Sequence, residues 1–308
     1  YFNKQTNSGF LLIGVLIDKN IGILNLIDIE KWKNSLDDFN PENFDGHFIL
    51  IKWNSEHITI FTDILGLRDI YLFHNTSEIL LVTNPLHLNS YTQLKIDFST
   101  FGSRWLLFNQ ISCDSIFQNI ERISSGKSLI IDRHTLKIKH KQYDFNPFYT
   151  GNYTFEDFES SLKHLIELPF TQNYHLSLSL SGGIDSRLIL SYLLNIKHQN
   201  WSVHTFGKIN NPDRIIAEQI INTLNIKSQI INKDLPNKDE LIKEIGEYTS
   251  FTMSSNPTSD IIQLINYSSL SGNNDVIIDG GFGEIWRRQF LNQLYFFGRK
   301  EIQNKNPL

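Results

Sequence analysis

The chain has 308 residues, of which 40% are hydrophobic and 20% are charged, and its formal net charge is -5. This length and composition are typical of a globular protein with two ordinary domains. The acidic balance argues against a nucleic-acid partner, and no run of about 18 apolar residues predicts a membrane span. One cysteine, Cys113, excludes an internal disulfide framework, and the lack of a signal-peptide pattern leads us to expect a cytoplasmic protein.

The first half of the chain carries strand patterns. Short segments rich in β-branched and aromatic residues alternate with Asn, Asp and Gly turns up to about residue 145. These segments are 9–17, 46–53, 57–65, 70–75, 78–84 and 126–144, with hairpins at 73–82 and 130–139. The pattern predicts an α+β domain over 1–150, with layered antiparallel sheets, a helix near 98–110 and a linker at 146–152.

The second half, 151–308, alternates strand and helix patterns. The predicted strands are 175–181, 201–207, 227–232 and 275–281, and the predicted helices are 185–195, 212–225, 238–249 and a segment near 258–270. This alternation predicts an α/β domain with a doubly wound parallel sheet, in which ligands bind outside the carboxyl ends of the strands. Two glycine-rich segments, "SGGIDS" (181–186) and "DGGFGE" (279–284), follow predicted strands at such ends.

The chemistry of "SGGIDS" favours a phosphate site. Gly182 and Gly183 let bare backbone N–H groups approach an anion at a helix N-terminus, and Ser181 and Ser186 add hydroxyl donors. Asp185 fits this cradle when Mg²⁺ bridges its carboxylate to phosphate oxygens. The simpler alternative is a strand-to-helix turn with a Ser or Asp cap.

"LSGGIDSRLIL" resembles the pyrophosphatase loop of the N-type ATP pyrophosphatases, a group that includes the asparagine synthetases. That resemblance implies an adenine nucleotide alpha-hydrolase-like fold and ATP contacts from the loop residues Leu180, Ser181, Gly182, Gly183, Asp185 and Ser186. "SVHTFG" is similar to the family's second strand, which implies an adenine contact near Phe206. "VIIDGGFGE" matches the place of its second loop, which makes Gly280 ligand-facing and implies Mg²⁺ ligands at Asp185 and Glu284.

The first half resembles the glutaminase domain of the same family, through "FDGHFILIKWNSEHITIFTDILGLRDIYLF" and "IFQNIERISSGKSLIID". This resemblance implies an Ntn-hydrolase-like fold. A working glutaminase uses an N-terminal cysteine nucleophile, whereas this chain begins with Tyr1 and its cysteine lies far along it. Thr62 also replaces the family's arginine before Asp63. We therefore expect an inactive glutaminase-like domain, with Cys113 as a buried small hydrophobe.

Two further departures concern the second domain. Gly281 stands where asparagine synthetases carry a glutamate, as in relatives whose substrate supplies its own nucleophile, such as β-lactam synthetases and lasso-peptide cyclases. The family also continues beyond the second loop with a helical segment that supplies a catalytic lysine, which leads us to expect that this chain is C-terminally incomplete. No catalytic residue is assigned for that reason.

Several other side chains have two interpretations each. Arg287, Arg288 and Lys208 either face phosphates or lie on solvated surfaces. His204 lies within a predicted strand and is expected to be packed rather than catalytic. Asp213, near a helix start, is most simply a favourable charge at the positive end of the helix dipole.

The predicted function is an ATP-dependent, amide-forming ligase. It adenylates a small-molecule or peptide carboxylate with Mg-ATP, and an amine donor then displaces AMP. One alternative is a glutamine-hydrolysing asparagine synthetase whose N-terminal cysteine lies outside this sequence. Another is a pseudoenzyme that binds nucleotide or a partner protein. The residues leave the two substrates and the oligomeric state open.

Overall fold

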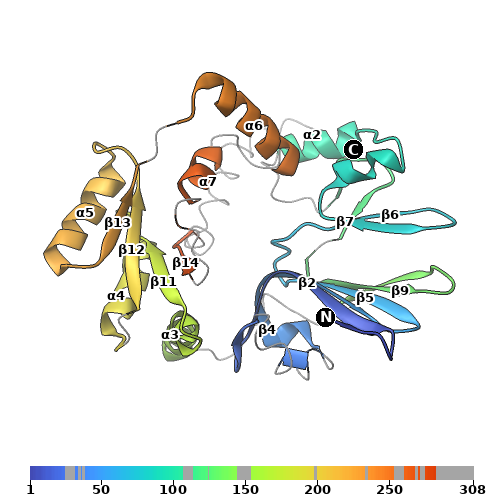
Figure 1. Ribbon diagram of the computed structural model, residues 1–308, viewed down its shortest axis with the longest axis horizontal. Helices are drawn as coiled ribbons and strands as arrows, with labels where there is room; N and C mark the ends of the chain where they lie inside the picture. Colours follow the sequence, from blue (N-terminus) through green and yellow to red (C-terminus); the bar gives the residue numbers. More distant parts are fainter. Residues whose placement is uncertain are drawn as a thin grey trace. The chain divides into compact units, whose positions relative to one another are not determined.

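A computed structural model describes residues 1–24, 32–33, 36, 39–106, 114–123, 125–143, 154–197, 200–232, 235–252, 260–267, 270 and 275–281. The chain divides into two compact units (Figure 1). Unit 1 comprises Tyr1–Tyr153 with Thr249–Asn256, and unit 2 comprises Thr154–Tyr248 with Pro257–Leu308. The domain boundary that the sequence places at residue 150 stays a prediction.

Unit 1 contains a large antiparallel sheet in the order β1-β2-β4-β5-β9-β10, with β3 paired to β2. Its strands are β1 (Phe2–Asn3), β2 (Ser8–Asp18), β3 (Gly22–Ile23), β4 (Phe44–Trp53), β5 (His57–Thr62), β9 (Lys127–Asp132) and β10 (Ile138–Gln142). The segments predicted at 9–17, 46–53 and 126–144 are confirmed as strands, because alternating β-branched and aromatic side chains suit a pleated surface.

A second antiparallel sheet, in the order β7-β6-β8, lies against the large one. Its strands are β6 (Tyr71–His74), β7 (Ile79–Val82) and β8 (Glu121–Arg122). Aliphatic side chains from both sheets, such as Ile49, Ile60 and Leu72, form one core between them. The outer face of the large sheet buries Phe48 beneath the helical residue Trp32. The predicted layering of antiparallel sheets is therefore confirmed for the described residues.

The helices of unit 1 are short. Those with bounds within the described residues are η1 (Pro41–Asn43), η2 (Pro85–Ser90) and α2 (Phe98–Leu106). The predicted helix at 98–110 is confirmed as far as Leu106, while Cys113 and the predicted linker at 146–152 lie outside the described residues. The segment predicted as strand to residue 65 ends at Thr62, because Asp63 is buried in a turn and accepts the Leu67 amide at 3.0 Å.

Unit 2 is built on a four-stranded parallel sheet in the order β13-β12-β11-β14. Its strands are β11 (His175–Ser179), β12 (Trp201–Phe206), β13 (Ser228–Ile231) and β14 (Asp275–Ile278). Its helices are α3 (Phe155–Thr171), α4 (Ile184–Asn195), α5 (Pro212–Leu224), α6 (Lys238–Thr252) and α7 (Ile261–Tyr267), and the end of α6 from Thr249 belongs to unit 1. The predicted alternation of parallel strands and helices is confirmed, whereas α3 is an element that the sequence analysis does not predict.

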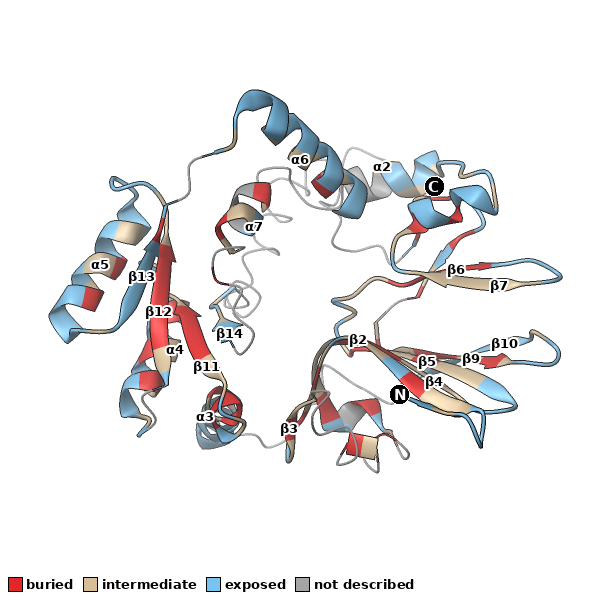
Figure 2. Ribbon diagram, in the orientation of Figure 1, coloured by how far each residue is buried: buried red, intermediate tan, exposed pale blue. Residues whose placement is uncertain are grey.

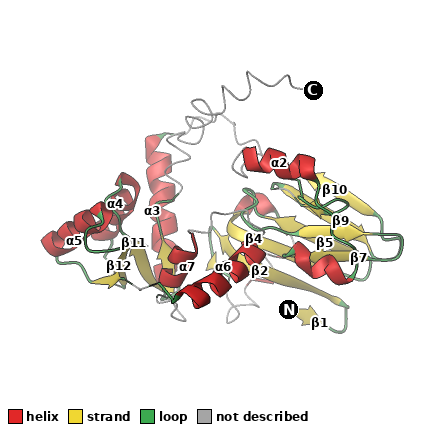
Figure 3. Cartoon of the chain, turned by 90° about the horizontal axis from the view of Figure 1, so that it is seen from above, coloured by secondary structure: helices red, strands yellow, loops and turns green. Residues whose placement is uncertain are grey.

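The two faces of this sheet differ in chemistry. One face carries Leu176, Leu178 and Val203, which pack with apolar side chains of α3, α4 and α5. Figure 2 colours most of β12 as buried, and Figure 3 shows α4 and α5 beside β11 and β12. The other face carries Ser177 and His204, and the ring of Tyr267 from α7 packs there. Helical residues therefore lie on both faces, which is compatible with the predicted doubly wound arrangement among the described elements.

Among the described helices, none combines the length and the apolar character that crossing a membrane requires.

Candidate functional site

The two glycine-rich segments lie on neighbouring strands. β11 pairs in parallel with β14, with Leu178 opposite Ile278, so the loops that follow them begin side by side. From β11 the chain moves outward through β12 to β13 and then returns to β14 on the other side of β11. The gap between β11 and β14 is thus a topological switch point, the place where parallel α/β sheets bind ligands.

The second loop touches the first helix turn directly. A Cβ atom on Gly280 would lie 2.8 Å from the Asp185 Cβ and 2.9 Å from the Ser186 backbone nitrogen. Such distances are shorter than carbon atoms tolerate, so this position requires glycine. The structure therefore brings Gly280 together with Asp185 and Ser186, three residues that the sequence analysis assigned to one site.

Hydroxyl groups brace the first loop from within. The Ser181 hydroxyl accepts a hydrogen bond from the Gly183 amide at 3.1 Å and lies 3.2 Å from the Ser186 hydroxyl. The buried Ser186 side chain also accepts the Ser181 amide at 3.2 Å. These hydrogen bonds stabilise one conformation of the turn between β11 and α4, so both serine hydroxyls have a structural role here.

The remaining glycine amide of this loop is bonded to a carboxylate. Gly182 N donates to Asp213 Oδ1 at 3.2 Å, and a Cβ on Gly182 would lie 2.9 Å from the same oxygen. Asp213 belongs to the first turn of α5, which Asn211 caps. Its carboxylate is the kind of acceptor to which an anion-binding amide donates. The sequence analysis predicted only a helix-dipole role for Asp213 and did not predict this hydrogen bond to the loop.

Asp185 lies half-buried in the first turn of α4. The N-cap of this helix is Gly183, which has no side chain, so the first helical amides have no capping side chain. Mg²⁺ in nucleotide sites uses one or two carboxylates and completes its shell with phosphate oxygens and water, so Asp185 suits that donor set. No cluster of three or more His, Cys, Asp or Glu side chains occurs among the described residues. Glu284, the second predicted ligand, lies outside them.

The two residues predicted to contact adenine lie at the ends of β11 and β12. Leu180 is buried, and its amide donates to the His204 carbonyl at 2.8 Å, which joins the two strand ends. Phe206 is half-buried, and its ring centroid lies 5.0 Å from that of Tyr267. Leu180 and Phe206 therefore lie side by side at the carboxyl edge of the sheet, and their contact with adenine stays a prediction.

His204 is fully buried beneath this edge, as expected for a packed residue. Its Nδ1 lies 2.7 Å from the Ser177 hydroxyl, while its Nε2 is buried without a hydrogen-bond partner among the described residues. Burial lowers the pKa of His204 to about 4, and the Asp279 carboxylate acts in the opposite direction. The imidazole is therefore neutral at pH 7.

Two residues at the carboxyl edge of the sheet were not predicted as site residues from the sequence. Asp279 follows β14 directly and accepts the Gly281 amide at 2.9 Å, and its charge acts on both His204 and Tyr267. The Tyr267 hydroxyl bonds to Ser179, and burial raises its pKa. The signal for Asp279 was its place before two glycines at a strand end. For Tyr267 no sequence signal exists, because α7 reaches the sheet through the fold alone.

At the opposite, amino edge of the sheet, three polar side chains form a chain. His175 Nδ1 lies 2.9 Å from Asp275 Oδ1, and its Nε2 lies 3.1 Å from the Ser202 hydroxyl. The order of groups is that of a Ser-His-Asp triad, but Ser202 is a buried strand residue. These hydrogen bonds give the three polar side chains partners where the strands begin.

The other candidate residues are placed as follows. Lys208 is exposed on the loop after β12. Arg287 and Arg288 lie outside the described residues, as does the part of the second loop beyond Gly281.

Comparisons with known proteins add little. No known family's sequence profile matches the chain, and no curated protein matches it. Among solved structures, it is similar to the allosteric regulatory enzyme of purine biosynthesis, with a TM-score of 0.31 and 9% identity over 91% of this chain and 62% of that one. A second is glutamine phosphoribosylpyrophosphate amidotransferase from B. subtilis complexed with ADP and GMP, with a TM-score of 0.27 and 9% identity over 78% and 51% of the two chains. The chain thus spans 62% or less of the length of these structures, and likenesses this weak carry no argument about function.

Proposed function

We propose that unit 2 binds Mg-ATP at the switch point between β11 and β14. The observation that supports this most is the forced approach of Gly280 to Asp185 and Ser186, because it joins the two glycine-rich loops into one site. The phosphates would lie along Ser181–Ser186 and the adenine near Leu180 and Phe206. Asp185, with Glu284, would hold Mg²⁺, which neutralises charge on the phosphate oxygens when bound.

The reaction proposed at this site is amide formation through an acyl-adenylate, as in the asparagine synthetases that the sequence resembles. A substrate carboxylate oxygen attacks the α-phosphorus and pyrophosphate leaves. An amine then attacks the activated carbonyl, the amide bond forms, and AMP leaves. The described loop offers alignment and hydrogen-bond donors rather than a covalent nucleophile, so its contribution is positioning and charge stabilisation.

The first test is binding of Mg-ATP by calorimetry to the chain and to Asp185→Asn. This variant removes the charge of the ligand with little change of shape, so we expect affinity for Mg-ATP to fall by at least tenfold. The matched control is Asp239→Asn, in the exposed first turn of α6, which should bind as the unaltered chain does. Equal affinity in all three proteins would refute the assignment of Asp185.

The second test is release of pyrophosphate by the full-length protein with Mg-ATP, screened against free amino acids and other carboxylates. Release that depends on one acid would support adenylation and identify the substrate class. Binding of ATP without release under any acid would favour the alternative of a nucleotide-binding pseudoenzyme. Steady conversion of glutamine to glutamate would favour the glutamine-hydrolysing alternative.

A further inference from the structure

One face of the unit 2 sheet is polar. Parallel sheets are usually covered on both faces, and their strands then consist of nearly continuous apolar runs. On β11, Leu176 and Leu178 point to the apolar face. Ser177 and Ser179 alternate with them and point to the other face. In the register with β12, Ser179 lies opposite His204, which therefore shares this polar face.

Most polar groups of this face bond to one another. The Ser177 hydroxyl lies 2.7 Å from His204 Nδ1, and the Ser179 side chain bonds to the Tyr267 hydroxyl. His204 Nε2 is the exception, since it is buried and has no hydrogen-bond partner among the described residues. The imidazole is neutral at pH 7, because burial lowers its pKa to about 4. These four side chains therefore supply no positive charge that could balance a nearby carboxylate.

Asp279 places a carboxylate at the carboxyl edge of the polar face. It is exposed and directly follows Ile278, which packs with the apolar core, so alternation puts Asp279 on the polar side. Its charge acts on both His204 and Tyr267, in agreement with that placement. The Gly281 amide donates to the carboxylate at 2.9 Å, and no described lysine, arginine or histidine forms an ion pair with it. The loop thus holds a negative charge without a counter-charge among those residues.

Tyr267 brings an aromatic ring to the same face. Its ring centroid lies 5.0 Å from that of Phe206 and 6.1 Å from that of His204, so α7 covers the face over β12. Over β14 the face is open, because Ile277, opposite Ser177 in the register, is 39% exposed. An open polar surface that carries both an aromatic ring and a carboxylate suits a cation, since each of them attracts positive charge.

Asp279 also adjoins the proposed nucleotide site. The next residue, Gly280, meets Asp185 and Ser186 of the first glycine-rich loop. A cation bound at Asp279 would therefore lie beside the phosphates proposed along that loop. In the proposed reaction, the group that must arrive there is the amine that attacks the acyl-adenylate. Alkyl amines have a pKa of about 10, as the lysine side chain does, so the amine arrives as an ammonium ion.

We propose that the amine donor is a primary alkyl amine that binds as its ammonium ion at Asp279, beside the ring of Tyr267. The carboxylate attracts and orients the ion. One proton leaves to water before the nitrogen lone pair attacks the carbonyl carbon. The C–O bond to AMP then breaks, AMP keeps the electron pair, and a second proton leaves the nitrogen. The role as amine donor rests on the proposed function, whereas binding of the ion at Asp279 does not.

The test is a ligand-observed NMR titration of the whole chain with benzylamine and with benzyl alcohol at neutral pH. Benzyl alcohol has nearly the same shape without the charge. We expect saturable binding of benzylamine that weakens as salt is added, and binding of benzyl alcohol that is weaker by roughly tenfold or more. Equal binding of the two probes, or no binding of benzylamine, would overturn the proposal.

Repeating the titration with Mg-ATP separates this inference from the proposed function. Binding of benzylamine by a chain that does not bind Mg-ATP would support the ammonium site and refute the nucleotide site. Binding of Mg-ATP by a chain that does not bind benzylamine would refute the ammonium site alone.

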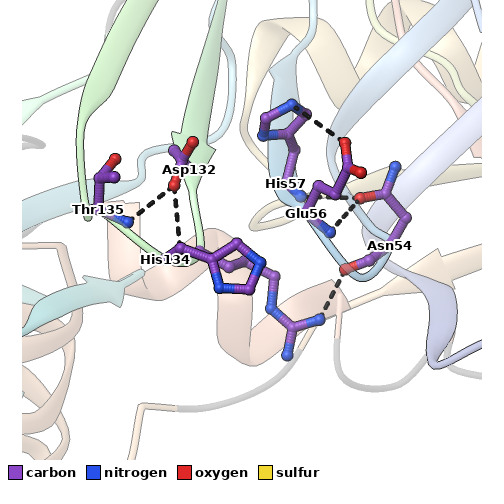
Figure 4. A network of polar contacts seen from close by, with 7 residues as sticks. Asn54, Glu56, His57, Asp132, His134 and Thr135 are labelled. Atoms are coloured by element: carbon purple, nitrogen blue, oxygen red, sulfur yellow. Dashed lines mark hydrogen bonds and ion pairs between the residues drawn. The ribbon is translucent and has the colours of Figure 1, made fainter.

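A variant assigns the binding to Asp279. Asp279→Asn keeps an oxygen for the Gly281 amide and removes the charge, so it should weaken benzylamine binding by roughly tenfold. The matched control is Asp132→Asn in unit 1. Asp132 also ends a strand and accepts backbone amides, those of His134 at 3.0 Å and Thr135 at 2.8 Å (Figure 4). The control should bind benzylamine as the unaltered chain does, and the same affinity in Asp279→Asn would refute the assignment.

The aromatic ring has a test of its own, which also serves if Asp279→Asn does not fold. Tyr267→Phe keeps the ring and should bind benzylamine as the unaltered chain does. Tyr267→Leu removes the ring and should weaken binding by about two- to fivefold, the worth of an exposed cation–π contact. Equal affinity in these two variants would show that the ring does not contact the ammonium ion.

Discussion

The amide of Gly182 donates a hydrogen bond to the carboxylate of Asp213, with 3.2 Å between nitrogen and oxygen. An acidic side chain from α5 thus occupies one of the backbone donors that the proposed phosphate loop would offer to ATP. Binding of a phosphate at that amide requires the carboxylate to share it or to move away.

We expect Asp213→Asn to bind Mg-ATP more tightly, by up to roughly tenfold, because the change removes a negative charge that repels phosphate. The variant should lose only about 0.3–1 kcal/mol of stability from the helix dipole. Calorimetry on this variant and on Asp239→Asn measures the effect. An affinity equal to or below that of the unaltered chain would show that Asp213 does not compete with the nucleotide.

Gly280→Ala should damage both the fold and the nucleotide site. The added methyl group would clash with Asp185 and with the backbone of Ser186, so we expect a loss of about 1–3 kcal/mol in the free energy of unfolding and weaker Mg-ATP binding. Gly246→Ala in α6 is the control, because nothing lies within 4 Å of a Cβ there. That control should gain up to about 1 kcal/mol. Urea denaturation compares the two, and equal stability would contradict the forced contact.

His204 should make unit 2 less stable in acid. The unfolded chain protonates this imidazole near pH 6.5, whereas the folded pKa is about 4, so the unfolded state binds more protons between these values. The free energy of unfolding should therefore fall as pH drops from 6.5 to 4, by roughly 3 kcal/mol in all, and level off below.

The check is urea denaturation at several pH values with His204→Asn, which keeps a polar atom near Ser177. This variant should be less stable at pH 7, and its free energy of unfolding should lack the part of the fall between pH 6.5 and 4 that His204 causes. His164→Gln, at an exposed position of α3, should retain it. The same acid dependence in His204→Asn would assign the effect to other groups.

The chain of Asp275, His175 and Ser202 should be structural. Ser202→Ala is expected to cost about 1 kcal/mol of stability, the worth of one hydrogen bond, with no change in Mg-ATP binding. Because Ser202 is buried in a strand, a fluorophosphonate probe should not label it. Mass spectrometry of the treated protein measures this, and labelling at Ser202 would establish a reactive serine instead.

Local pattern was enough to predict most elements of both units. The alternation around Leu176, Leu178 and Val203 and the apolar spacing of α4 and α5 arise from neighbours in the chain, so the sequence shows them directly. Helix α3 was missed although Thr154 and Asp157 form a capping box at its start. Its buried residues lie late in the helix, around Ile166 and Phe170, beside Pro169.

The candidate site was likewise predictable from the sequence only in part. The sequence by itself determined the residue types at the strand ends: two glycines that admit a close backbone approach, and Asp185 in a first helix turn. The tertiary structure alone decided that β14 returns beside β11, that Gly280 meets Asp185, and that Asp213 reaches the Gly182 amide. These are contacts between residues far apart in the chain, and pairing across such distances depends on the packing of the whole sheet rather than on local conformational preference.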